Sequence, residues 1–229
     1  MKNFISTLFA LTFLFTNTIL GQDIPPTITT TGEAVVYAAP NEIVTSYTVV
    51  TQSASVVESK KENSEISKKA IKFLSEKGIS SEHIQTQYMS VYRDKRNPVD
   101  PFRVSQRFEI CIQDISTYEE IVDGLLERGV ENLTGPTFRN TNIKKYKDQA
   151  RTKAIKNAKE KAVLLAEGLN QQVGKAYEIK EKTAYSSNRA QGGYGTSEVE
   201  LEANLDDNTS FAPGQLKVRA RVEVRFYLR

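Results

Sequence analysis

The amino-acid sequence predicts an α+β fold, in which a ferredoxin-like β-α-β-β-α-β core is extended by a long alanine-rich helix and a long C-terminal antiparallel strand. Three patterns predict this fold. Two segments of helical period each lie between strand-like runs, alanine recurs at every fourth position over residues 150–166, and apolar and polar residues alternate without a break over 216–228. The 229 residues, of which 39% are hydrophobic and 26% charged, suit a globular protein with a sizeable core.

The N-terminal segment, residues 1–21, has the pattern of a secretory signal peptide. Lys2 precedes an apolar run from Phe4 to Leu20, and Gly21 offers a small residue for cleavage. A transmembrane anchor is the alternative, but polar residues interrupt the run, so we favour cleavage and a periplasmic or secreted protein. The single cysteine, Cys111, lies far from this site, so we expect neither a lipoprotein anchor nor an intramolecular disulfide.

The first strands are expected after an extended leader at residues 22–31, so that the structured domain spans 32–229. One strand is predicted over 32–39 and a second over 42–52, with the turn pair Pro40-Asn41 between them. Alternate β-branched and aromatic residues in the second run indicate one half-buried face. A hairpin of these two strands is the natural interpretation.

A first helix follows and ends before Gly78, which suits the left-handed position of a helix C-terminus. Its amphipathic spacing is carried by Val57, Ile66, Ala70, Phe73 and Leu74. Strands are then expected over 84–92 and 104–112, on either side of a polar, proline-containing loop.

A second helix is predicted to begin at Ser116, with Glu119 completing a capping box, and to stop at Gly129. The ends of the two helices resemble each other, because Leu74 to Ile79 parallels Leu125 to Val130 in sequence. Helices commonly end at glycine, so coincidence is the alternative. The order of strands and helices makes us favour a structural repeat.

The C-terminal half is expected to form a third helix over 143–171, a strand over 177–183, a mobile acidic loop at about 184–212 and a long final strand. The alanine stripe of the helix would allow close packing against a sheet or a partner helix. The final strand alternates Leu216, Val218 and later apolar residues with lysine, arginine and glutamate, so it should have one buried and one solvated face.

Catalytic chemistry finds little support in the sequence. His83 is the only histidine, which excludes a multi-histidine metal site, and no GxSxG, phosphate-binding loop or GxGxxG motif is present. Cys111 lies in an alternating strand, where we favour a packing role over a redox thiol. We therefore predict no catalytic, cofactor-binding or metal-binding residues, although a Ser-His-acid triad through His83 stays an alternative.

The third helix is basic, while the chain as a whole has a formal net charge of only +3. A patch for nucleic acid or anionic lipid is one interpretation of these lysines, and a solvated face opposite the alanine stripe is the one that we favour. No aromatic residue beyond Tyr146 interleaves the basic positions, so we expect no nucleic-acid partner.

The sequence resembles the SIMPL-domain family, also called DUF541, over roughly residues 31–229. The family's opening Gly-x-x-x-Val strand and Pro-Asp turn are similar to Gly32 to Ile43, with Asn41 in place of the aspartate. Its alanine-rich helix and the following glycine and strand are similar to Ala150–Ile179, and its closing strand to Pro213–Leu228. The resemblance implies an extracytoplasmic protein without established enzymatic activity, linked to oxidative-stress protection, with one periplasmic relative forming a channel-like ring.

Two functions are consistent with these observations. The first is a non-catalytic envelope protein that assembles with copies of itself through the long C-terminal strand and the alanine-striped helix. The second is a monomeric periplasmic module that binds an anionic ligand or a membrane surface, through lysines such as Lys153, Lys156 and Lys159 or through the acidic loop. Neither the ligand nor the number of subunits follows from the sequence.

Overall fold

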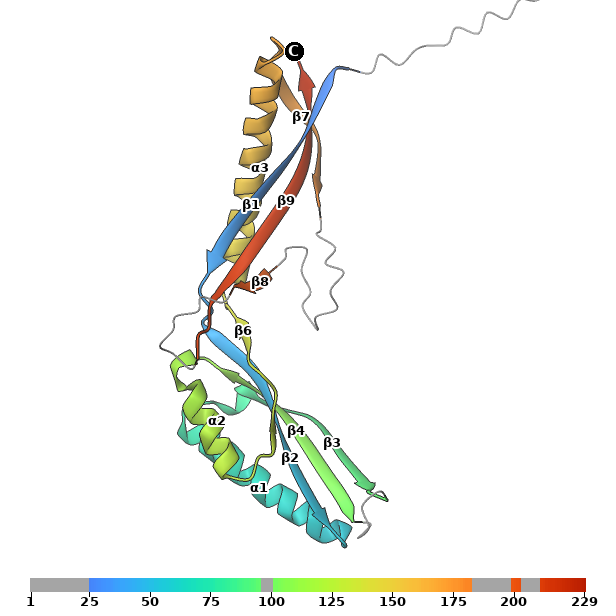
Figure 1. The fold of residues 1–229 in the computed structure, drawn as a ribbon, viewed down its shortest axis with the longest axis vertical. Helices are drawn as coiled ribbons and strands as arrows, with labels where there is room; N and C mark the ends of the chain where they lie inside the picture. The colour runs from blue at the N-terminus through green and yellow to red at the C-terminus, as the bar shows by residue number, and fades with distance from the viewer. Residues whose placement is uncertain (1–24, 96–100, 183–198, 203–210) are drawn as a thin grey trace, which may run out of the picture.

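The computed structural model describes residues 25–95, 101–182, 199–202 and 211–229, and the predicted signal peptide lies outside these ranges. The chain forms two lobes placed end to end, so that the molecule is elongated (Figure 1). Each lobe is an antiparallel sheet with helices packed on one face. The mixed α+β class predicted from the sequence is confirmed.

The lower lobe in Figure 1 is the predicted β-α-β-β-α-β unit. Its sheet has the order β3-β4-β2-β5, with β6 also pairing with β2, and all these pairs are antiparallel. Each helix therefore connects two parallel strands with an antiparallel strand between them, which is the split arrangement of ferredoxin-like folds. The elements are β2 (Glu42–Ser53), α1 (Val56–Glu76), β3 (Ile84–Arg93), β4 (Phe102–Ile112), α2 (Tyr118–Glu127), β5 (Asn132–Leu133) and β6 (Thr137–Arg139), with short 3-10 turns at Ser81–His83 and Ile115–Thr117.

The two helices of this lobe end in the same way, as their sequences predicted. Gly78 and Gly129 take φ values of 85° and 88°, in the left-handed region. The amide of Ile79 then donates to the carbonyl of Leu74 at 3.0 Å, and the amide of Val130 donates to the carbonyl of Leu125 at 3.2 Å. Both ends are thus glycine-terminated helix caps with a buried apolar residue after the glycine.

The predicted capping box at the start of the second helix is wrong. Asp114 provides the cap, because its Oδ1 accepts from the amide of Ser116 at 3.0 Å and from its hydroxyl at 2.6 Å. These bonds hold a 3-10 turn, and α2 itself begins at Tyr118. Asp114 thus accepts from the Ser116 amide, which in the expected capping box would donate to the Glu119 side chain.

The upper lobe is formed by segments from the two ends of the described chain. It contains β1 (Thr27–Ala38), α3 (Ile143–Glu167), β7 (Val173–Glu181), β8 (Val199–Glu202) and β9 (Gln215–Leu228). The long strand β9 is central, with β1 along one edge and β7 and β8 sharing the other. Helix α3 packs along β1 and β9. The predicted long alanine-rich helix and long C-terminal strand are confirmed.

The hairpin predicted for the first two strands is wrong. β1 pairs with β9 in a register that runs from Thr27 opposite Tyr227 to Ala38 opposite Leu216, whereas β2 lies in the other sheet. The turn pair Pro40-Asn41 carries the chain from one lobe to the other. There Asn41 binds the returning segment, since its Nδ2 donates to the Thr141 hydroxyl at 2.7 Å and its Oδ1 accepts from the Thr141 amide at 2.9 Å.

Other predicted boundaries also change. The strand expected over 177–183 is β7, which begins four residues earlier, at Val173. β1 begins at Thr27, inside the expected leader, and α3 ends at Glu167, four residues earlier than expected. The expected loop at 184–212 contains β8 and Phe211, which stacks on Tyr118 with ring centroids 4.7 Å apart; its other residues except Ala212 lie outside the described ranges. Apolar residues alternate with glutamates at 198–202, which is a strand pattern. The sequence prediction missed it because the acidic residues favoured a loop.

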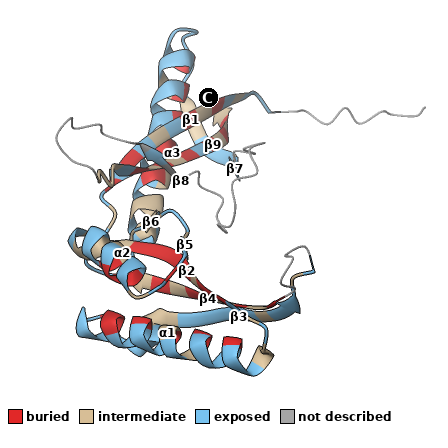
Figure 2. Cartoon of the chain, turned by 60° about the horizontal axis from the view of Figure 1, so that its bottom comes forward, coloured by how far each residue is buried: buried red, intermediate tan, exposed pale blue. Residues whose placement is uncertain are grey.

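The two lobes have separate hydrophobic cores, and Figure 2 shows their buried residues on the faces where helices meet sheets. The lower core contains Tyr47 and Phe108, whose rings stack 4.9 Å apart, together with leucines and isoleucines of α1, α2 and β4. The upper core pairs small residues of α3 with β-branched residues of β9. Its helix side consists of Ala150, Ala154, Ala158 and Ala162.

Candidate functional site

The single histidine and the single cysteine both line one small hollow at the end of the lower lobe's sheet. Its volume is about 150 Å³, and its other lining residues come from the end of α1 and from the stretch between β4 and α2. His83 contacts the side-chain amide of Gln113, with the two nitrogens 2.9 Å apart. Among the described residues, no three histidine, cysteine, aspartate or glutamate side chains are grouped to hold a metal ion.

The environment of Cys111 opposes nucleophilic or redox chemistry. Its thiol lies 3.5 Å from a carboxylate oxygen of Glu42, to which it donates a hydrogen bond. Burial and the Glu42 carboxylate raise the pKa of Cys111 to about 11. Because the thiolate is the reactive form, this thiol is held in its unreactive, protonated state at neutral pH. The side chain is half-buried on the sheet face opposite Ile110 and Ile112.

The pH dependence of Cys111 alkylation tests this assignment. In the folded protein, the rate of reaction with iodoacetamide should keep rising to about pH 11, whereas an ordinary thiol levels off above about pH 8.5. Glu42→Gln removes a negative charge that opposes ionisation, so the midpoint should move to lower pH. The folded state also binds this proton more tightly than the unfolded chain, so its contribution to stability falls as the pH rises between these two values. A midpoint near 8.5 in the folded protein would contradict the assignment.

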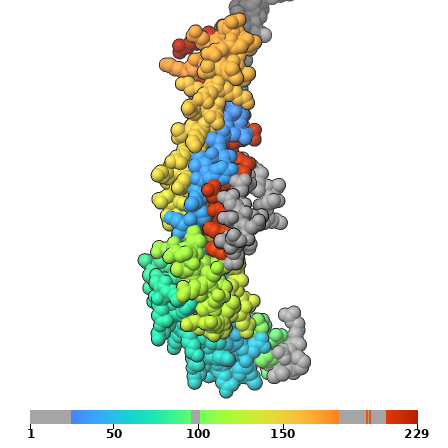
Figure 3. Space-filling model, turned by 60° about the vertical axis from the view of Figure 1, so that its left-hand side comes forward, coloured from blue at the N-terminus to red at the C-terminus, as the bar shows by residue number. Residues whose placement is uncertain are grey.

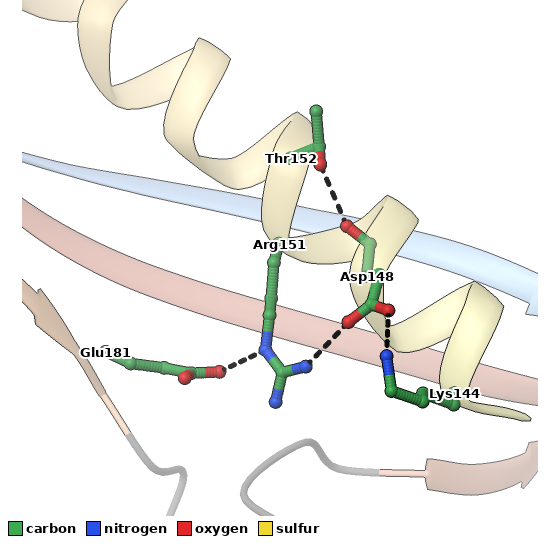
Figure 4. A network of polar contacts seen from close by, with 5 residues as sticks. All are labelled: Lys144, Asp148, Arg151, Thr152 and Glu181. Carbon is green, nitrogen blue, oxygen red and sulfur yellow. Dashed lines mark hydrogen bonds and ion pairs between the residues drawn. The ribbon is translucent and has the colours of Figure 1, made fainter.

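The basic helix α3 is a solvated face crossed by ion pairs. Asp148 accepts from Lys144 at 2.8 Å and from Arg151 at 3.0 Å, and Arg151 also binds Glu181 at 2.8 Å (Figure 4). Hydrogen bonding from Lys144, supported by Arg151, lowers the pKa of the Asp148 carboxyl. Figure 4 shows that this network joins the helix to the end of β7. The arginine therefore fixes the helix against the sheet rather than pointing to a ligand.

An open hollow of about 780 Å³ lies along the first half of α3. Among the described residues its lining comes from one face of this one helix, including Lys144, Lys145 and Lys153. The described lining thus has no opposing wall with converging polar groups, which a small-molecule site needs.

The two contact surfaces expected for self-assembly are both occupied within the chain. The five alanines of the stripe, from Ala150 to Ala166, are buried, and the stripe packs on β1 and β9. Strand β9 carries a hydrogen-bonded neighbour along each edge. Neither the stripe nor an edge of β9 is therefore free for a second copy among the described residues, because the stripe packs on the chain's own sheet.

An exposed edge strand remains as the most prominent interaction surface. β3 pairs with β4 on one side, and no described strand pairs with its other side. Four of its large side chains are 43 to 48% exposed: Tyr88, Met89, Val91 and Tyr92. Met89 and Val91 stand opposite Gln106 and Val104, on the face that carries α1, while Tyr88 and Tyr92 stand opposite Arg107 and Arg103 on the other face. Both faces of this edge thus carry partly exposed apolar or aromatic side chains, beyond the β-bulge between Thr86 and Tyr88.

Sequence reasoning placed this strand correctly but missed its exposure. The run over residues 84–93 contains a single charged residue, Arg93. Native edge strands are commonly protected by charges or prolines, so a run that is poor in both suggests a central strand. That signal points to a partner for this edge once the sheet order is known.

A model of the SIMPL family, described as a protein of unknown function (DUF541), matches residues 28–226. Two groups of relatives are similar to the chain. The uncharacterized protein YggE of Escherichia coli K12 is 28% identical over 160 residues, which cover 68% of this chain and 65% of that protein. The 26 kDa periplasmic immunogenic protein of Brucella melitensis is 25% identical over 217 residues, which cover 90% of this chain and 86% of that protein.

The chain thus spans just under two thirds of the length of the E. coli relative that it matches. Neither relative carries an enzymatic name. No helix in the described ranges has the length and apolar character that crossing a membrane requires. The match over 28–226 includes both lobes, so the similarity is not confined to one sheet.

Proposed function

The chain belongs to the SIMPL family, and from this premise we propose that it is a non-catalytic protein outside the cytoplasm that assembles with copies of itself through the exposed edge of β3. The location is supported by the signal-peptide pattern of residues 1–21 and by the Brucella relative, which is named periplasmic. A role in envelope or oxidative-stress protection is carried by the family resemblance alone. The proposal of a non-catalytic role is supported by the sequence, which has a single histidine and no GxSxG, phosphate-binding-loop or GxGxxG motif, and by the two relatives, neither of which carries an enzymatic name.

The observation that carries the assembly proposal is the exposure of apolar side chains on both faces of β3. A ligand lying on one face of the sheet would cover Tyr88 and Tyr92, or Met89 and Val91. A strand added alongside β3 covers all four and also pairs the outward backbone groups. Long apolar edges of this kind are sites of strand pairing between chains.

A second copy of β3 fits this edge in the antiparallel direction. The strand carries one charge, Arg93, at its end. A two-fold axis would place the two arginines at opposite ends of the paired ribbon, whereas a parallel pair would put them side by side. Antiparallel pairing therefore avoids like-charge repulsion and gives the self-complementary contact of a two-fold dimer.

Mass measurement of the protein in solution tests the proposal. We expect a dimer or a multiple of it for the wild type, and a shift to monomer for Met89→Lys, because a charged side chain in the middle of the edge would be buried against the paired strand. Ile71→Lys is the matched control, since Ile71 is an exposed isoleucine on α1 of the same lobe. It should leave the mass unchanged.

A wild-type protein that stays monomeric at every concentration would overturn the assembly proposal. The alternative is then a monomeric module that binds an anionic ligand through α3, where Lys153 and Lys159 are exposed. Charge reversal of Lys153, Lys156 and Lys159 would weaken retention on a polyanion column at low salt in that case. Retention that is unchanged by this reversal would count against the alternative.

A further inference from the structure

We propose that the free end of the upper lobe docks on the surface of an anionic phospholipid membrane. The contact is made by the leucine patch, defined as Leu164, Leu165 and Leu169 at the end of α3. These side chains are 71%, 46% and 73% exposed. The proposal does not depend on self-assembly, because β3 lies in the other lobe.

Within the described part of the chain, the leucine patch takes no part in the upper core. The core-facing positions at this end of the helix are Ala162 and Ala166, both buried. Leu165 and Leu169 continue the row of Asn157 and Lys161 in steps of four, and Leu164 lies beside that row. The exposed face of α3 is otherwise rich in charge, so three leucines together at its end form a distinct apolar surface.

The patch lies at the extreme end of the elongated molecule. The orange end of α3 forms this tip in Figure 3, and Figure 1 shows that β1 begins and the C-terminus lies at the same end. The amide of Leu228 donates to the carbonyl of Pro26 at 2.8 Å, which fixes the start of the described chain there. The tip can therefore approach a flat surface without obstruction from the lower lobe.

Charge at the tip favours anionic lipid. Lys161 lies one turn before Leu165, Lys175 lies at the start of β7, and Arg229 follows the end of β9. These three basic groups outnumber the carboxylates at the tip, which are Glu167 and the C-terminal group of Arg229. Lysine and arginine side chains near a bilayer reach up to headgroup phosphates while apolar neighbours enter the interface. Exposed leucines flanked by basic side chains are typical of protein surfaces that bind at the membrane interface.

Vesicle sedimentation tests this proposal. The protein that begins at Gln22 contains every described residue, and it should pellet with vesicles that contain phosphatidylglycerol. The triple variant Leu164→Ser, Leu165→Ser, Leu169→Ser should lower this binding by about tenfold or more. Leu126→Ser changes an exposed leucine in the lower lobe and is the matched control, with binding unchanged. Lys161→Glu should weaken binding to phosphatidylglycerol vesicles more at low salt than at high salt.

Three outcomes overturn the proposal: no sedimentation of the wild type with phosphatidylglycerol vesicles, equal binding by the triple variant, or a lower solution mass for the triple variant without vesicles. The last outcome would assign the leucine patch to a contact between copies. The Met89→Lys variant separates the two proposals, because it should lose assembly while it still binds vesicles. Thermal unfolding should be nearly unchanged for the triple variant, since exposed positions contribute little to stability.

Discussion

Replacing Gly32 with alanine is expected to destabilise the protein by at least about 3 kcal/mol, an unusually large effect for adding one methyl group. Gly32 lies in the middle of β1, where the strand passes under α3. A Cβ atom at this position would lie 2.0 Å from the carbonyl oxygen of Ala154 and 2.5 Å from the amide nitrogen of Ala158. Both are backbone atoms, so no side-chain rotation relieves the overlap.

The helix would have to move away from the sheet to admit the methyl group. That movement would open the packing of Ala154 and Ala158, which are fully buried, and stretch the 2.7 Å bond from the Thr30 hydroxyl to the carbonyl of Ala158. It would also disturb the bond of Asn157 to the carbonyl of Glu33 at 2.8 Å. One substitution thus acts on every contact that holds β1 to α3 at this point.

Urea or thermal unfolding of Gly32→Ala measures this effect, and Gly135→Ala is the control. Gly135 has open space around its missing side chain and no left-handed backbone, so alanine should be tolerated there within about 0.5 kcal/mol. Equal stability of the two variants would show that α3 and β1 are not in close contact in solution. Hydrogen exchange should locate the loss of protection in β1, β9 and α3.

The elements of this fold follow from the sequence, but their partners do not. The alanine stripe and the alternation of residues 216–228 predicted α3 and β9 correctly, because these periods depend on local geometry. The pairing of β1 with β9 joins residues that are about two hundred positions apart, and nothing within either strand specifies the other. Pro40-Asn41 reads locally as a hairpin turn, and only the bond of Asn41 to Thr141 reveals a crossing between lobes.

The candidate surfaces show the same limit. Composition alone shows that His83 is the only histidine, and this argues against a multi-histidine metal site. The availability of a surface depends on what packs against it. The alanine stripe was expected to contact another copy, yet it is covered by β1 and β9. Met89 and Val91 do not stand out in the sequence, and they are exposed because β3 is the last strand of its sheet.

Leu74→Ala is expected to destabilise the lower lobe by about 2–5 kcal/mol. Leu74 is fully buried in the last turn of α1, in the core cluster that contains Phe73, Ile79 and Leu125. Alanine keeps the helix propensity and the backbone carbonyl that accepts from Ile79, so the loss comes from the cavity and from apolar burial. Ile71→Ala, three residues earlier at an exposed position, should cost much less.

Combining Leu74→Ala with Gly32→Ala tests whether the two lobes are separate units of stability. The two core clusters share no residue, so neither substitution changes a contact of the other. If the lobes unfold separately, each substitution lowers the unfolding free energy of its own lobe alone. The double variant should then show both single-lobe losses side by side, each unchanged by the other within about 0.5 kcal/mol. Hydrogen exchange should show lost protection in α1 and β2 for Leu74→Ala, and in β1 and α3 for Gly32→Ala. A coupling above 1 kcal/mol, or loss of protection across both sheets from either substitution, would mean that the crossing at Asn41 and Thr141 transmits strain and that the lobes unfold as one body.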